Sequence, residues 1–491
     1  MSKEIVKSVE RLVSDDDLLA RPLLFDFHPL SITRVVRSLP GRRLVCQGSW
    51  NDRHVFAKIF FGKEDKRYFE RDLRGSRLLE AAEIRTPELL FAGPDDQCLS
   101  HCLIFEAIAA GKNAQQFWDM ADAEQRLALM QDLVVEVARH HHAGLMQTDL
   151  YLNNFLYESG KLYTLDGDGI RRLPGMFKRN AELRNLALLL SKFDVLDLQQ
   201  ELPQLLAMYA RERGWRNSLS ISHVQKRIFA TRRRVVEKYA DSKVFRECTD
   251  IQVKRTRCRF QAAARIYASR LLDQALAEPD HLLDADRFMR LKSGNTCTVA
   301  LAEIDDRKVV VKRYNIKSFW HGLSRALRQS RAAVSWSNAH RLKMLDIATA
   351  EPVALLERRY GLIRQQAYLL TEYVDAPDIH DFFTDVQVTD THKQAVAANV
   401  ARLFEKLNLL AISHGDFKAT NVKISGSQPL LIDLDSMRQH TCRRVFERQH
   451  VRDLRRFLQN WQHQPQNKAM LTEAFRKFYK DSSLLQQAGW L

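Results

Sequence analysis

The stretch HGDFKATNVKISGSQPLLIDLD, residues 414–435, decides the fold through the spacing of three polar side chains. Asp416 lies in a predicted loop, Asn421 follows five residues later, and Asp433 follows seventeen residues after Asp416 at the end of an apolar strand. A loop carboxylate can orient a hydroxyl group. A hairpin can then return the chain, so that an amide oxygen and a strand-end carboxylate reach one metal ion. The stretch therefore predicts a metal-dependent reaction at a loop.

An earlier stretch, QTDLYLNNFLYESGKLYTLDGD at residues 147–168, repeats this spacing. Asp149 is followed by Asn154 after five residues and by Asp166 after seventeen. Two sets with the same intervals are hard to obtain by chance, although a lone amide of this kind is often only a turn-stabilising residue. The repeat indicates two copies of one structural unit.

Each stretch has a lysine upstream in an apolar strand. RHVFAKIF contains Lys58, which precedes Asp149 by 91 residues, and RKVVVKRYN contains Lys312, which precedes Asp416 by 104. A strand lysine followed by a loop Asp, an Asn and a strand-end Asp is the order found in kinases. We therefore expect Lys58 and Lys312 to hold the phosphates of ATP, with Mg²⁺ as the metal.

Further residues of a nucleotide site can be proposed around each lysine. A turn before the second strand lysine contains Gly294. Two apolar strands end near an acid, Glu106 in the first half and Glu372 in the second, where the backbone would pair with the adenine edge. The lysine also needs a helix acid. In the first half we expect Glu70, with Asp72 or Glu80 as alternatives. In the second half no acid occurs between Lys312 and Leu345, and the expected position falls near Asn338 or His340.

These elements predict an α+β fold. It would consist of two tandem protein-kinase-like bilobal domains, each with a β-rich small lobe and a mainly helical large lobe. We expect the first domain at residues 1–225 and the second at residues 276–491. A basic helical connector would join them at residues 226–275. Residues 226–270 contain fourteen Lys or Arg and four Asp or Glu. Their charge fits either a solvated helix face with ordinary ion pairs or a platform for anionic headgroups.

The composition limits the partners and the compartment. A net charge of +16 favours anionic partners such as a phosphorylated saccharide or an acidic membrane surface. No nucleic-acid motif accompanies the charge, so nucleic acid is not expected. Seven scattered cysteines without a CxxC pair favour a reducing compartment. No apolar run spans a bilayer and no secretory leader begins the chain, so we expect a cytoplasmic protein whose membrane contact, if any, is peripheral.

These motifs together resemble a known family. The phrases LKSGNTCTVA, VVVKRYN, SRAAVSWSNAHRL and ISHGDFKATNV in the second half, with HHHAGLMQTDLYLNNFL and LYTLDGDGIRR in the first, are similar to bacterial lipopolysaccharide core kinases. This is the Kdo and heptose kinase group, called WaaP-like or InaA-like. The resemblance covers most of residues 40–200 and 245–460. One departure is Gln147, which stands where a catalytic-loop His is usual; the second half has His414 there.

The resemblance implies a function. It implies ATP- and Mg²⁺-dependent phosphorylation of a heptose or Kdo sugar in the lipopolysaccharide inner core, at the cytoplasmic face of the inner membrane. Asp149 and Asp416 would serve the acceptor hydroxyl, and Asn154, Asp166, Asn421 and Asp433 would hold metal. The absence of an A-P-E tripeptide also favours a glycan over a peptide acceptor. The alternative is a binding or scaffold protein in which one or both halves only bind nucleotide or organise envelope assembly.

Overall fold

The chain divides into two compact units. The computed structural model describes residues 23–25, 27–39, 42–95, 100–108, 111–158, 160–216, 219–284, 289–293, 297–315, 329–360 and 363–491. Unit 1 comprises residues 1–193 and 200–231, and unit 2 comprises residues 194–199 and 232–491. Both units mix helices and strands, as expected for an α+β protein. Within the described residues, no helix has the length and apolar character needed to cross a bilayer.

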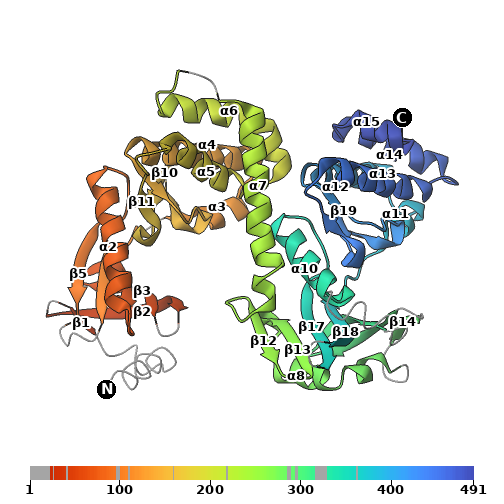
Figure 1. Ribbon diagram of the computed structural model, residues 1–491, viewed down its shortest axis with the longest axis horizontal. Helices are drawn as coiled ribbons and strands as arrows, with labels where there is room; N and C mark the ends of the chain where they lie inside the picture. Colours follow the sequence, from red (N-terminus) through yellow and green to blue (C-terminus); the bar gives the residue numbers. More distant parts are fainter. Residues whose placement is uncertain are drawn as a thin grey trace. The chain divides into compact units, whose positions relative to one another are not determined.

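Unit 1 begins with an antiparallel sheet in the order β1-β2-β3-β4-β6-β5 (Figure 1). Helix α2 (Asp65–Ala81) packs against this sheet. The strands are β1 (Leu23–Phe25), β2 (His28–Leu39), β3 (Arg43–Trp50), β4 (Arg53–Phe60), β5 (Leu89–Pro94) and β6 (His101–Glu106).

The rest of unit 1 is mainly helical. Its elements are β7 (Lys112–Asn113), α3 (Ala114–Met120), α4 (Ala123–His142), β8 (Leu145–Gln147), β9 (Phe155–Glu158), β10 (Lys161–Thr164), β11 (Ile170–Arg172) and α5 (Lys178–Leu190), followed by most of α6 (Val195–Glu212) and the first half of α7 (Ile221–Ala240). Residues 194–199 and the part of α7 from residue 232 onward belong to unit 2. Helix α4 starts at a capping box in which Asp122 and Gln125 satisfy each other's backbone N–H groups. Leu133 and Val137 of this helix are buried, as is Leu186 of α5.

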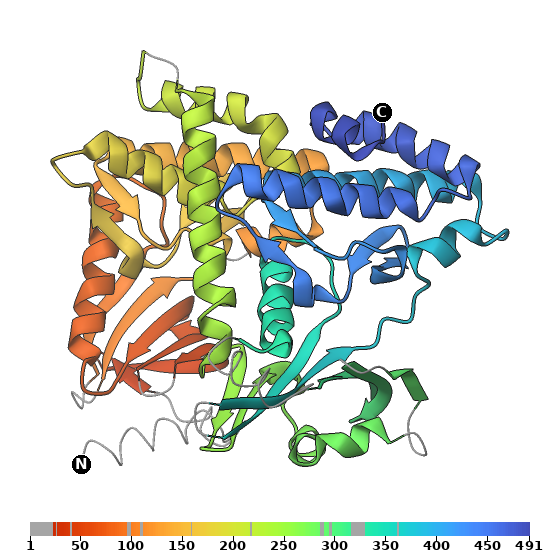
Figure 2. The ribbon, with the colours of Figure 1, turned by 45° about the vertical axis from the view of Figure 1, so that its right-hand side comes forward.

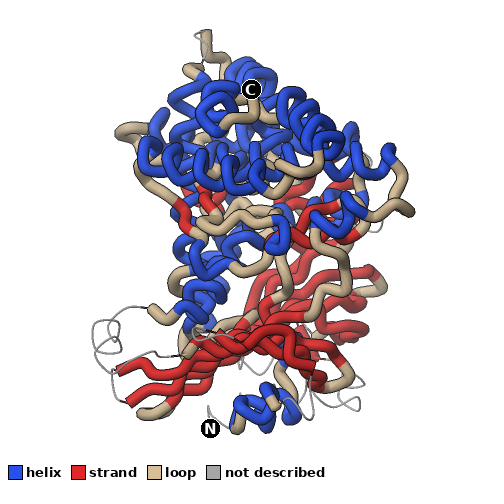
Figure 3. The backbone as a smooth tube through the Cα atoms, turned by 90° about the vertical axis from the view of Figure 1, so that its right-hand side faces the viewer, coloured by secondary structure: helices blue, strands red, loops and turns tan. Residues whose placement is uncertain are grey.

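Unit 2 repeats the central strand order of unit 1 within a larger sheet. Its order is β12-β13-β17-β18-β16-β15-β14, so the hairpin β15–β16 and the strands β18 and β17 match β3–β4, β6 and β5. The strands of the protein are red in Figure 3. The elements are β12 (Ile251–Arg255), β13 (Arg259–Ala264), α8 (Arg270–Ala277), β14 (Met289–Ser293), β15 (Cys297–Ile304), β16 (Arg307–Tyr314), α10 (Arg331–Met344), β17 (Pro352–Tyr360) and β18 (Ile363–Glu372).

The rest of unit 2 is mainly helical (Figure 2). It encloses a large aromatic core. Its elements are α11 (Ile379–Thr384), α12 (Asp390–Leu409), β19 (Ile412–Ser413), β20 (Val422–Ser425), β21 (Gln428–Leu431), β22 (Arg438–Gln439), α13 (Arg443–Gln459), α14 (Pro465–Phe478) and α15 (Ser482–Ala488). Phe404, Phe457, Trp461 and Phe475 are fully buried there. This core supports the loop that carries Asp416, because Phe417 packs on Phe404 with ring centroids 4.3 Å apart.

The expected helical connector is only partly helical. Helix α7 covers its first part, but β12 and β13 follow and belong to the sheet of unit 2, where β13 pairs with both β12 and β17. The prediction of helices was wrong there because β13 is covered on both faces. Residues 260–264 are all buried, which removes the polar alternation that marks a strand. Several cations of this region form ordinary ion pairs, such as Lys254 with Asp273 at 2.6 Å.

Candidate active sites

In unit 1, the strand lysine meets two carboxylates. Lys58 lies on β4, and its Nζ is 2.8 Å from Asp72 Oδ2 and 2.9 Å from Asp166 Oδ1. Asp72 comes from α2, and its side chain is fully buried. The alternation of β4 explains the direction of Lys58, because Phe60 on the same face packs against Phe69 of α2. The structure therefore joins Lys58 to Asp166, as the sequence predicted.

The prediction that Glu70 is the helix partner of Lys58 was wrong. Glu70 is exposed, and Asp72, one of the two alternatives, lies beside Lys58. A signal for this choice exists in the sequence. Phe69, Asp72, Ser76 and Leu79 follow helical spacing and are all buried, so Asp72 is the acid on the inward face of α2. Glu70 and Glu80 lie off that face.

Arg43 completes an ion network that the sequence analysis missed. Its Nη1 is 3.4 Å from Asp72 Oδ2 and 3.7 Å from Asp166 Oδ1, so two cations face two carboxylates. Burial alone would raise the pKa of Asp166, but Lys58 and Arg43 outweigh it and hold that pKa well below its ordinary value. Burial likewise favours a lower pKa for Lys58, but Asp72 and Asp166 raise it above its usual value. The network thus keeps both groups charged.

In the described part of unit 2, the strand lysine meets carboxylates from a single segment. Lys312 Nζ is 2.5 Å from Asp433 Oδ1 and 3.5 Å from Asp435 Oδ2. Arg331 of α10 binds Asp435 at 2.6 Å. Burial opposes the charged form of Lys312, but Tyr314, Asp433 and Asp435 raise its pKa above the ordinary value. Burial also favours a raised pKa for Asp433, but Lys312 lowers it below its usual range.

An arginine that both helices share shows which residue of α10 stands where α2 has its acid. In unit 1, Arg71 of α2 binds Asp168 with Nη2 and Oδ2 2.7 Å apart, as Arg331 of α10 binds Asp435. Placed in register by these arginines, Asp72 corresponds to Ala332, which is fully buried. An apolar methyl group therefore replaces the carboxylate, and Asp435 is the additional acid near Lys312.

Asn338 and His340, the residues expected near this position, have other contacts. Asn338 Nδ2 donates to the backbone oxygens of Leu434 and Met437, both at 2.9 Å. It therefore fixes the segment after Asp433 to α10. His340 is buried edge-on against Trp336, with ring centroids 4.4 Å apart. In unit 1 the same junction is made by two glycines, since a Cβ on Gly75 would lie 1.8 Å from the backbone oxygen of Gly167.

The two acidic loops share their internal hydrogen bonds. Asn154 Nδ2 donates to the backbone oxygen of Asp149 at 2.7 Å, and Asn421 Nδ2 donates to that of Asp416 at 2.9 Å. Each amide is thus oriented with its nitrogen toward the loop, which leaves the carbonyl oxygen as the atom suited to a metal. The backbone N–H groups of residues 165 and 432 donate to the backbone oxygens of Asn154 and Asn421, at 2.8 Å and 3.0 Å.

The strand-end aspartates adopt the same unusual backbone conformation. Asp166 has φ 67° and Asp433 has φ 62°, which is the left-handed region that few non-glycine residues enter. This turn directs each carboxylate back toward its lysine. Strained backbone of this kind is concentrated at functional sites. The structure thus brings together, in each unit, the lysine and the strand-end aspartate that the repeat predicted.

The anchor beneath each loop differs between the units. In unit 2, the Asp453 carboxylate accepts from the backbone N–H of His414 at 2.7 Å and of Gly415 at 3.0 Å. Burial raises the pKa of Asp453 to about 7, although these two donors oppose the shift. In unit 1, Asn185 replaces this acid and donates instead to the backbone oxygen of Gln147 at 2.7 Å. Gln147 itself is buried.

Each loop aspartate also has an ammonium group nearby. Lys418 Nζ is 2.7 Å from Asp416 Oδ2. Tyr151 stands at the equivalent position of the first loop, and Lys192 reaches it from another segment, with Nζ 4.3 Å from the Tyr151 ring centroid. Burial lowers the pKa of Lys192, and the charge of Asp149 opposes this. Neither lysine was predicted from the sequence. Lys418 could have been found from its place two residues after Asp416, whereas Lys192 has no local signal.

The remaining predicted residues have mixed outcomes. Gly294 lies outside the described residues. Glu106 and Glu372 end β6 and β18. Their backbone N–H groups already donate to the backbone oxygens of Glu88 and Glu351, both at 2.9 Å. An adenine would therefore need a donor further along the chain. Gly48 lies within strand β3, between β2 and β4, and is required by packing, because a Cβ there would lie 2.1 Å from the backbone oxygen of Ser31.

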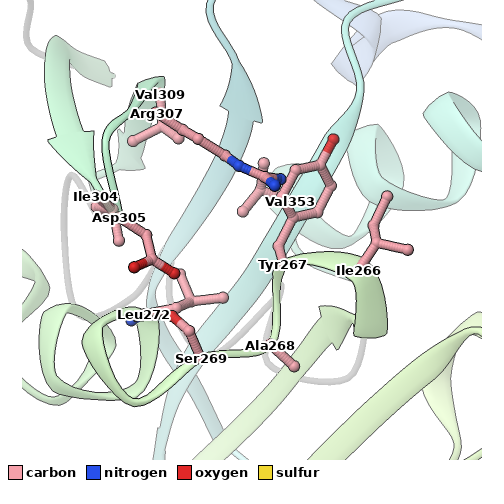
Figure 4. Close-up of a pocket in the computed structure, with 10 residues that line it drawn as sticks. All are labelled: Ile266, Tyr267, Ala268, Ser269, Leu272, Ile304, Asp305, Arg307, Val309 and Val353. Carbon is pink, nitrogen blue, oxygen red and sulfur yellow. Dashed lines mark hydrogen bonds between the residues drawn. The ribbon is translucent and has the colours of Figure 1, made fainter.

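A separate small pocket lies on the other face of the second sheet (Figure 4). Val309 lines it, and Lys312, three residues along β16, points to the opposite face. The Arg307 guanidinium lies over the Tyr267 ring at 5.2 Å, and Ser269 and Asp305 lie at one side. The pocket is thus distinct from the lysine–aspartate cluster.

Comparison with known proteins gives a family match within the second unit. The model of the lipopolysaccharide kinase (Kdo/WaaP) family matches residues 285–475. This part of the chain is therefore similar to lipopolysaccharide kinases. No curated protein matches the chain. Among solved structures, WaaP in complex with acyl carrier protein aligns with 46% of this chain and 92% of its own length, at 19% sequence identity and a TM-score of 0.33.

The family match contains every element of the second site. Lys312, Asp416, Asn421, Asp433 and Asp453 all lie within the matched residues. The lipopolysaccharide kinase family brings with it an enzyme class, a phosphotransferase that acts on a sugar hydroxyl. The match begins after residue 231, so the first site stands on its geometry alone.

Proposed function

We propose that the protein is an ATP-dependent kinase that phosphorylates a heptose or Kdo sugar of the lipopolysaccharide inner core. The observation that carries the proposal is the ion pair of Lys312 with Asp433, with Nζ 2.5 Å from Oδ1, inside a family match that also contains Asp416. The acceptor would be an anionic glycolipid or its phosphorylated core oligosaccharide, which suits a chain of net charge +16. We place the reaction at the cytoplasmic face of the membrane that carries this glycolipid.

The donor atoms of the second site fit Mg²⁺. Asp433 offers a carboxylate and Asn421 an amide oxygen, and hard oxygen ligands of this kind suit magnesium together with phosphate oxygens. When bound, Mg²⁺ would neutralise charge on the phosphates. Lys312 now shares its ammonium with Asp433 and Asp435, and it would turn to the phosphates of ATP. Arg331 would keep Asp435 in place.

The chain's own residues would then position the acceptor. Asp416 would accept the proton of the sugar hydroxyl while the hydroxyl oxygen forms a bond to the γ-phosphorus of ATP. The bond from that phosphorus to the bridging oxygen breaks, and ADP leaves with its electron pair. Lys418, 2.7 Å from Asp416, would stabilise the transferred phosphoryl group. Most of the rate gain would come from this positioning and from electrostatics.

We also propose that unit 1 is a second protein-kinase-like bilobal domain, so that the chain is a tandem. The matched hydrogen bonds of the two loops and the left-handed Asp166 and Asp433 support this. Under this proposal Lys58 would hold phosphates, Asn154 and Asp166 would hold metal, and Asp149 would face an acceptor.

A second candidate function is favoured by the residues that differ between the two units at equivalent positions of their sites. Unit 1 has Gln147 and Asn185 where unit 2 has His414 and Asp453, and unit 2 has Ala332 where unit 1 has Asp72. One of the two sites could therefore bind nucleotide without catalysis and organise the other unit. The family match favours unit 2 as the catalytic one.

Phosphate transfer from ATP to deacylated lipopolysaccharide core tests these proposals. Asp416→Asn should lower the rate by about 10²–10⁴-fold, with Asp149→Asn as the matched change in unit 1. An unchanged rate for Asp149→Asn together with loss for Asp416→Asn would assign catalysis to unit 2. If the double variant still formed product at the normal rate, the proposed kinase function would be wrong.

A further inference from the structure

A loop in unit 1 presents two large apolar side chains to solvent. Met176 is 76% exposed and Phe177 is 77% exposed, and residues 174–179 are all exposed. We call residues 174–179 the Met-Phe loop. Single exposed apolar residues are common on protein surfaces, but an adjacent pair at a loop tip is a feature of surfaces that meet lipid or another protein.

The charge around the Met-Phe loop has one sign. Residues 169–181 contain Arg171, Arg172, Lys178 and Arg179 and no acid. Cations close to an anionic bilayer each add to the attraction, while apolar side chains enter the boundary between headgroups and acyl chains. This combination of chemistry fits an anionic lipid surface. A polyanion such as nucleic acid would use the four cations but would leave the apolar pair in water.

The backbone holds the apolar pair outward. Phe177 has φ 58° and ψ 29°, a left-handed conformation that is costly for a bulky residue. Its carbonyl oxygen accepts from the N–H groups of Asn180 at 2.9 Å and Ala181 at 3.1 Å, so it starts helix α5. That helix is anchored by buried residues such as Leu186 and Leu190. The loop tip is therefore fixed to the core of unit 1 rather than attached by a free segment.

The Met-Phe loop follows directly on the candidate site of unit 1. Strand β11 ends at Arg172 and pairs with β8, the strand that leads into Asp149. The backbone N–H of Leu173 donates to the oxygen of Gly144 at 2.7 Å, and that of Thr148 donates to Gly169 at 2.8 Å. Tyr151, in the same acidic loop, is 55% exposed.

From these observations we infer that the Met-Phe loop docks unit 1 onto an anionic lipid bilayer, with Met176 and Phe177 inserted between the headgroups. The docking itself needs no catalysis. Its consequence, that a membrane glycolipid is brought to the site of the kinase, rests on the proposed function.

Sedimentation with lipid vesicles tests the docking on the full chain. Vesicles of phosphatidylcholine with phosphatidylglycerol should retain the wild-type protein, and vesicles of phosphatidylcholine alone should retain much less. The double change Met176→Ser and Phe177→Ser should lower the bound fraction about tenfold or more. Arg172→Gln with Lys178→Gln should also lower it and should remove part of its salt dependence. The matched control is Val386→Ser, because Val386 is 94% exposed but lies beside Asp385.

The outcomes separate this inference from the proposed function. Equal vesicle binding by the wild type and the Met176/Phe177 double variant would overturn the docking surface. Loss of binding only in the Arg172/Lys178 variant would also overturn it, since that result means simple polyanion attraction. Phosphorylation of deacylated core should be unchanged in the Met176/Phe177 variant, and failure of that reaction in the wild type would count against the kinase proposal alone. A changed oligomeric state of the variant would indicate that the loop covers protein instead.

Discussion

The assignment of Asp72, rather than Glu70, as the partner of Lys58 makes a sharp prediction. Asp72→Asn removes one charge from a network in which Lys58 and Arg43 face Asp72 and Asp166. The isosteric amide leaves two buried cations against one carboxylate. Glu70→Gln is the matched control, because it makes the same chemical change two residues earlier on the exposed face of α2.

The magnitude follows from the burial of the network. The side chains of Asp72, Arg43 and Lys58 are 0%, 11% and 13% exposed. Removing one partner of a buried ion pair costs about 3–5 kcal/mol. Asp166 remains 2.9 Å from Lys58 and compensates in part, so we expect about 2–3 kcal/mol. A tenfold change in an equilibrium constant corresponds to about 1.4 kcal/mol, so local opening should increase by about 30- to 150-fold.

Hydrogen exchange of the full chain measures this opening. Peptides that cover α2 and residues 160–170 should exchange faster in Asp72→Asn by that factor, while peptides from unit 2 should be unchanged. Glu70→Gln should leave all rates within about twofold of wild type, since exposed substitutions rarely change stability by more than about 0.5 kcal/mol. Equal acceleration in both variants, or in neither, would refute the assignment of the buried network.

Three further predictions concern other parts of the two sites. Asp453 is protonated more readily in the folded protein, with a pKa of about 7 against an ordinary 3.8. Its stabilising contribution is therefore complete below about pH 3.8 and is lost as the pH rises through about 7. In thermal unfolding, the melting temperature of Asp453→Asn should depend less on pH than that of the wild type. Lys418→Met should lower kcat for sugar phosphorylation by about 10- to 100-fold with little change in KM, and Lys192→Met should do so only if unit 1 is catalytic, as steady-state kinetics would show. Gly75→Ala should destabilise unit 1 by about 3 kcal/mol or more because of overpacking, while Arg74→Ala on the exposed face of α2 should be neutral by calorimetry.

Spacing in the sequence was sufficient to predict that the strand lysine meets the strand-end Asp in each half. The loop Asp, the Asn and the strand-end Asp of each half lie within eighteen residues of one another, so a single hairpin holds them in one segment. The catalytic and metal-binding roles of these residues stay predictions. The choice between Glu70 and Asp72 required knowledge of which helix face turns inward, and the buried spacing of α2 contains that information. Arg43 and Lys192 come from distant segments, and only the folded chain brings them to the aspartates.

The strands β12 and β13 show a different limit. The residues of β13 lack polar alternation because neighbouring elements cover both of its faces, and the alternation of β12 extends over only five residues. Helical and strand patterns cannot be distinguished in such a segment by periodicity alone. The basic charge of residues 226–270 added to the error, since it suggested one continuous solvated helix, whereas the cations at 254, 259 and 265 belong to or border a sheet.

The helix beside each strand lysine, α2 in unit 1 and α10 in unit 2, packs directly against the segment that follows the strand-end aspartate. This contact restricts how the helix can move. In unit 1 the backbones of Gly75 and Gly167 touch without room for a methyl group, and in unit 2 the Asn338 amide bridges two carbonyl groups beyond Asp433. An outward rotation of the helix alone would break these contacts. We therefore expect α2 and α10 to move together with the segments that carry Asp166 and Asp433, so that the distance from each helix to its aspartate changes little when either site opens.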